Sequence, residues 1–183
     1  RNKETADSEN KYIFSCLNTD KVCVFTDSGR MHTIKVLDLP FGKFRDKGTP
    51  IDNVSNFDSS AEQMVFVSSL SGIKESMLFF ATKTGMLKQV AGTEFDVSKR
   101  TIAATKLAEG DRLILVQIAD PMEYVVLQTK NGLFLRFMKE EVPDKRRLPL
   151  VCAASVLQRM TRWSTRICWK AVRNTPSPIK RRM

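Results

Sequence analysis

The chain has 183 residues, 42% of them hydrophobic, and a formal net charge of +10. This length predicts one domain or a little more, with enough apolar residues for a core. Because no secretory leader and no apolar run of 18 residues occur, we expect neither an exported nor a membrane-spanning protein. The four cysteines lack the paired spacing of a zinc site and are too few for a disulfide framework, which favours a reducing cytosol.

The excess of positive over negative charge is confined to the end of the chain. Residues 1–142 contain 19 bases and 19 acids, whereas residues 143–183 contain 11 bases and one acid. Both tryptophans, Trp163 and Trp169, also lie in this last part. The body and the tail are therefore different kinds of sequence.

The sequence of the body, residues 1–142, predicts mainly β-strands. Residues 1–11 are polar and aperiodic, so we expect a disordered N-terminal segment. Residues 18–21 predict a turn and residues 40–50 a loop, and Glu109-Gly110-Asp111 predicts a further turn. Apart from the hairpins described next, the stretches expected to be strands are residues 12–17, 51–57, 64–68, 102–107 and 112–118.

A hairpin unit occurs three times. Each copy has an apolar run, then Thr-x-x-Gly, then a second run that ends in or contains a base, which is a hairpin signature. The turn glycines are Gly29, Gly85 and Gly132, and the hairpins cover residues 22–35, 77–90 and 124–137. Since one hairpin cannot bury its apolar face alone, the repeats predict an all-β, propeller-like array in which each unit forms a four-stranded antiparallel blade.

These repeats resemble a known family, the C-terminal domain of the bacterial DNA gyrase A protein, which the paralogous A protein of topoisomerase IV shares. The resemblance covers roughly residues 12–145. The matching segments are Asn18-Thr19-Asp20, Thr26-x-x-Gly29-Arg30, Lys47-Gly48-Thr49-Pro50-Ile51, Ala81-Thr82-Lys83-x-Gly85, Glu109-Gly110-Asp111, Thr129-x-x-Gly132, Arg136-Phe137 and Glu140-Glu141-Val142.

The resemblance implies a partial β-pinwheel over residues 12–145, whose basic rim binds and bends duplex DNA. It implies a cytoplasmic, nucleoid-associated protein whose partners are double-stranded DNA, the rest of the topoisomerase A protein and the ATPase subunit of the same enzyme. The family's catalytic tyrosine lies in another domain, so we expect no catalytic residue here. We also expect no cofactor, metal, membrane or small-molecule substrate.

Bases at matched repeat positions are the candidate DNA-binding residues. Cations along a track suit phosphates, because each neutralised phosphate releases condensed counterions. The predicted set is Arg30, Lys35, Lys43, Arg45, Lys47, Lys83, Lys88, Lys99, Arg100, Lys130 and Arg136. The alternative is a protein-interaction propeller fragment with ordinary solvated bases, which the zero net charge of residues 1–142 favours. His32, the only histidine, lacks a metal-ligand or nucleophile partner at matched spacing, so a structural role is expected.

The tail, residues 146–183, breaks the repeat, and two explanations remain open. Reading the codons for residues 150–155 in a shifted frame can give Gly-Val-Arg-Gly-Ile, which is typical of the family at this place. Our hypothesis is thus that the tail is translated out of frame. The alternative is a genuine basic tail that is disordered or helical, and an amphipathic helix is possible because Val156, Met160, Trp163 and Ile167 fall on one helical face among bases.

Overall fold

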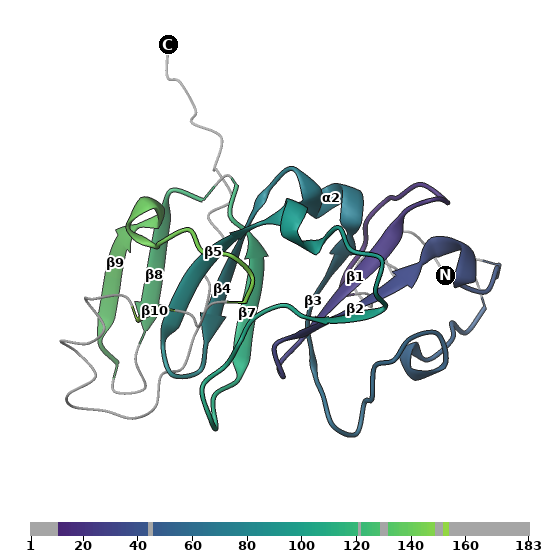
Figure 1. Ribbon diagram of the computed structural model, residues 1–183, viewed down its shortest axis with the longest axis horizontal. Helices are drawn as coiled ribbons and strands as arrows, with labels where there is room; N and C mark the ends of the chain where they lie inside the picture. The colour runs from purple at the N-terminus through teal and green to yellow at the C-terminus, as the bar shows by residue number, and fades with distance from the viewer. Residues whose placement is uncertain (1–10, 44–45, 121, 129–131, 149–151, 154–183) are drawn as a thin grey trace, which may run out of the picture.

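The computed structural model describes residues 11–43, 46–120, 122–128, 132–148 and 152–153. Three antiparallel sheets lie side by side along the long axis of the molecule (Figure 1). The α-helix α2 (Leu70–Lys74) is one turn long, and no helix in the described ranges is long and apolar enough to cross a bilayer. The predicted all-β fold class is confirmed.

Blade 1 is a four-stranded sheet in the order β3-β1-β2-β6. At its centre, β1 (Lys21–Thr26) and β2 (Arg30–Lys35) form the first predicted hairpin. The strand β3 (Met64–Ser69) pairs with β1, and β6 (Thr101–Ala103) pairs with β2. All these pairs are antiparallel.

Blade 2 repeats this plan in the order β7-β4-β5-β10. The hairpin consists of β4 (Met77–Thr82) and β5 (Met86–Ala91). The strand β7 (Leu113–Ile118) pairs with β4, and β10 (Cys152–Ala153) pairs with β5. Within the described part of the tail, residues 146–148 and 152–153, the β10 strand takes a blade position, and the residues of the expected helix lie outside the described ranges.

Blade 3 is the hairpin of β8 (Tyr124–Gln128) and β9 (Phe134–Met138). Within the described part of the chain it has two strands.

One of the two outer strands of each four-stranded blade comes from the following repeat. β6 follows the second hairpin in sequence but pairs with the first, and β10 follows the third hairpin but pairs with the second. The expectation that each unit forms its own blade is therefore wrong in this respect. Alternation of apolar residues identifies a strand, but it does not specify which sheet edge that strand completes.

Three glycines make the hairpin turns, as predicted. Gly29, Gly85 and Gly132 have φ angles of 76°, 87° and 80°, in the left-handed region that glycine adopts without steric cost. The recurring threonine contributes to the same turns, because Thr26 Oγ1 lies 2.9 Å from Ser28 Oγ, and Thr82 Oγ1 lies 3.2 Å from the hydroxyl of its neighbour two residues on.

A short 3-10 helix follows each hairpin. These helices are η1 (Val36–Asp38), η3 (Gly92–Phe95) and η4 (Lys139–Glu141). The first residue of each donates its backbone N–H to a carbonyl just before the same hairpin, at 3.0, 2.8 and 2.9 Å respectively. The third repeat thus keeps the local geometry of the first two.

Two predicted strands are not formed. Residues 12–17 run as coil, and the Tyr12 hydroxyl donates to the Val65 carbonyl oxygen at 2.7 Å. Residues 51–57 begin with the 3-10 helix η2 (Ile51–Asn53). There, the Ser55 hydroxyl donates to the Ile51 carbonyl oxygen at 2.9 Å, and such local side-chain bonds compete with a sheet ladder. The predicted strands at residues 102–107 and 112–118 are shortened to β6 and β7.

Apolar clusters join the blades on both faces of the β4–β5 hairpin. One face packs with blade 1 and the other with blade 3, so consecutive residues of β4 are buried. Blade 1 contributes Cys23, Phe25 and Met31, which meet Leu78, Phe80 and Val90 of blade 2. On the other side, Phe79, Ala81 and Leu87 meet Val125, Leu127 and Phe137 of blade 3.

Candidate nucleic-acid interface

Five of the predicted DNA-binding lysines are exposed and form no ion pair with the described residues. They come from different parts of the repeats: the end of β2, the loop after η1, the β4–β5 turn and the segment before β6. They are Lys35, Lys43, Lys47, Lys83 and Lys99. Lysines in this state can approach a phosphate without first breaking a salt bridge.

Two predicted arginines hold parts of blade 1 together. Arg30 Nη1 lies 3.1 Å from Glu62 Oε1, although the arginine side chain is 60% exposed. Arg100 Nη2 lies 3.6 Å from Asp38 Oδ2, which joins the second repeat to the first. A phosphate would have to compete with these carboxylates or share the remaining N–H groups.

Arg136 is exposed on β9, and its guanidinium lies 4.9 Å from the centre of the Tyr124 ring on β8. A cation on an aromatic face is held in place while part of it stays open to solvent. Arg45 and Lys130 lie outside the described residues.

Lys88 is a correction to the predicted set, because its side chain is buried. Its ammonium donates to the Arg147 carbonyl oxygen at 2.7 Å and lies 5.6 Å from the centre of the Phe80 ring. The position three residues after the turn glycine faces inward in blade 1 too, where His32 occupies it. The recurrence of a polar residue at this place reflects an interior position.

His32 of β2 lies in a buried polar network within blade 1. Its Nε2 lies 3.2 Å from Glu62 Oε2, and its Nδ1 lies 3.1 Å from Thr101 Oγ1 of β6. Burial of the Glu62 carboxyl opposes its ionisation, but hydrogen bonds from Thr26, His32 and Ser28 hold its pKa below the ordinary value. The network links β6, the strand that comes from the second repeat, to blade 1, which this strand completes.

Other exposed bases were missed by sequence reasoning. Lys11, Lys106 and Arg112 are exposed in the structure but lie at positions that do not recur among the three repeats. Exposure in a β-strand or turn depends on the neighbouring blade, so the sequence carried no signal for them. Within the described ranges, no cluster of His, Cys, Asp or Glu could hold a metal ion.

Comparison with known proteins relates this geometry to a family. The profile of the DNA gyrase C-terminal domain, a β-propeller, matches residues 76–120 and 123–148. The DNA gyrase A protein of Deinococcus deserti is 36% identical over 135 residues, which is 73% of this chain. The chain belongs to the DNA gyrase A C-terminal domain family. The DNA gyrase A protein of Chlamydia trachomatis is 34% identical over 135 residues, or 72% of the chain.

Solved structures of family members have the same fold. The C-terminal domain of DNA topoisomerase IV matches with a TM-score of 0.64 and 20% identity, over 82% of this chain and 49% of that one. The E. coli ParC C-terminal domain matches with a TM-score of 0.62 and 17% identity, over 76% and 57%. The chain spans only 17% and 16% of the two gyrase A proteins.

Proposed function

We propose that this chain is a non-catalytic DNA-binding module of the A protein of a type IIA DNA topoisomerase, which wraps or steers a duplex segment. Its partners would be duplex DNA, the rest of the A protein and the ATPase subunit of the enzyme, in the bacterial cytoplasm at the nucleoid. The observation that carries the proposal is the set of exposed lysines without an ion pair to described residues, on a fold of the gyrase family.

Binding of this kind acts on the DNA backbone. Lysine ammonium groups neutralise phosphates and release counterions, whereas reading of sequence requires side chains that reach base edges. Arg30, Arg100 and Arg136 would add contacts through N–H groups that their present partners leave open. Affinity should therefore be low, dependent on salt and insensitive to base sequence.

The salt dependence of binding to a short labelled duplex tests the proposal. About three to five contacts at about 0.9 each give a modest slope of log K against log salt. The variant Lys35→Gln/Lys43→Gln/Lys47→Gln/Lys99→Gln should lower this slope by about 1 to 3, because one to three of the phosphate contacts are lost. The control is Lys74→Gln/Lys139→Gln, because these lysines pair with Asp96 and Asp120, at 2.7 and 3.5 Å.

The slope of the control should change less for each charge removed. Binding that is independent of salt, strongly selective for sequence or absent would contradict the proposal. An absence of duplex binding would favour the alternative function, a protein-interaction module without a nucleic-acid role.

A further inference from the structure

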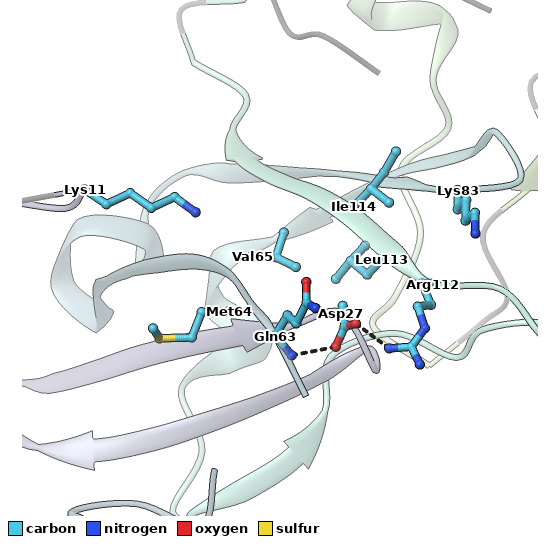
Figure 2. A pocket seen from close by; sticks show the side chains of 9 residues that line it. All are labelled: Lys11, Asp27, Gln63, Met64, Val65, Lys83, Arg112, Leu113 and Ile114. Carbon is cyan, nitrogen blue, oxygen red and sulfur yellow. Dashed lines mark hydrogen bonds and ion pairs between the residues drawn. The ribbon is translucent and has the colours of Figure 1, made fainter. Parts of the chain in front are cut away.

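A surface notch lies where β3 of blade 1 meets β7 of blade 2. It has a volume of about 300 Å³, at the lower end of the range for ligand pockets. The residues that concern its chemistry are Lys11, Asp27, Gln63, Lys83 and Arg112, and the apolar part of its lining includes Val65, Leu113 and Ile114. Figure 2 shows Lys11 at one end of the notch and Lys83 with Arg112 at the other.

The notch carries a surplus of positive charge. Asp27 is the one acid that lines it, and this carboxylate is buried and already engaged. It accepts the backbone N–H of Gln63 at 2.9 Å and forms an ion pair with Arg112 (Figure 2). Lys11 and Lys83 have no acidic partner among the residues that the structure describes. Two positive charges therefore remain.

Donors also outnumber acceptors. Arg112 uses one of its five N–H groups on Asp27, and the two lysine ammonium groups add more donors. The carbonyl oxygen of Val65 is occupied, since it accepts the Tyr12 hydroxyl at 2.7 Å. The apolar part of the lining lowers the local dielectric and so strengthens attraction toward an anion. A ligand with several acceptor oxygens and negative charge matches these walls.

The positions of the bases indicate an elongated ligand. Because Lys11 and the Lys83–Arg112 pair stand at opposite ends, anionic groups are needed at both ends of the notch. None of the nine lining residues is aromatic, so stacking of a base is not the mode of recognition. A sugar–phosphate chain carries successive negative charges along its length, with an apolar sugar edge between them.

We propose that the notch binds consecutive phosphates of one nucleic-acid strand, with Lys11 on one phosphate and Lys83 with Arg112 on another. The inference rests on the proposed DNA-binding function and adds a specific contact point between two blades. The Asp27–Arg112 ion pair holds the guanidinium at the notch, so Arg112 is both a link between blades and a phosphate ligand.

The experiment compares Lys11→Gln/Lys83→Gln with Lys74→Gln/Lys139→Gln, which removes the same charge from lysines that are already paired. Binding of a short duplex is measured by fluorescence anisotropy over a range of salt. The notch variant should lower the slope of log K against log salt by about 1.8, and the control by clearly less. Unchanged melting temperatures establish that both variants fold.

A second measurement locates the contact. Amide chemical shifts of Val65, Leu113 and Ile114 are followed as pyrophosphate, and separately duplex DNA, is added to the wild-type chain. Shifts with both support the notch. If the duplex binds but the notch variant behaves like the control, or if these amides do not respond, the inference is overturned while the proposed function stands. If wild-type protein does not bind the duplex at all, both are overturned.

Discussion

At the scale of single residues, Glu62 links the stability of blade 1 to pH. Its side chain is 5% exposed and contacts Arg30 and His32. A carboxyl with a lowered pKa stabilises the fold above its ordinary pKa, here 4.5, and this contribution is lost as the pH falls through the lowered value. We predict that Glu62→Gln reduces the free energy of unfolding at neutral pH by about 1 to 3 kcal/mol.

Urea unfolding at neutral pH and at acid pH checks this prediction. The difference between wild type and Glu62→Gln should shrink as the pH falls from 4.5 through the lowered pKa of Glu62, because below that value both chains carry a neutral group at this position. Glu109→Gln, in the exposed turn before β7, is the control and should show no such difference. A difference for Glu62→Gln that is independent of pH would contradict the role of the charge.

At the scale of elements, Gly92 allows η3 to lie directly against α2. A Cβ atom at this position would lie 1.6 Å from the Ile73 carbonyl oxygen and 2.9 Å from that of Ser76. Because both are backbone atoms, the two elements would have to separate. We predict that Gly92→Ala destabilises the fold by about 1 to 3 kcal/mol or more, measured as a shift of the urea midpoint. Gly48→Ala, with open space around it, should be nearly neutral.

Among the elements, the sequence predicts the hairpins but not all of the strand pairing. The three hairpins were predictable, because positive φ at Gly29, Gly85 and Gly132 and the alternation beside them are local properties. The pairing of β6 and β10 with earlier blades was not, since it depends on contacts between repeats. Likewise, a lysine that recurs in the sequence can be buried, as Lys88 is, or exposed, as Lys83 is.

At the scale of the whole molecule, blade 3 differs from blade 2 in what surrounds it. β4 has a paired strand on each side and apolar contacts on both faces, whereas β8 has one described partner strand and contacts on one face. On the other face of blade 3, Tyr124 is 42% and Phe134 66% exposed. These residues stand at the same distances from their turn glycine as Met77 and Leu87, which pack between blades 2 and 3.

Local opening should therefore be easier in blade 3. We predict that the amides of Val125 and Leu127 exchange with solvent at least about tenfold faster, after correction for intrinsic rates, than those of Leu78 and Phe80. The comparison is matched, because the members of each pair occupy equivalent places before the turn glycine and all four side chains are buried. Hydrogen exchange followed by NMR measures it directly. Equal protection in the two hairpins would mean that blade 3 gains support equivalent to that of β7 and blade 1, and the reasoning from paired strands and covered faces would then fail.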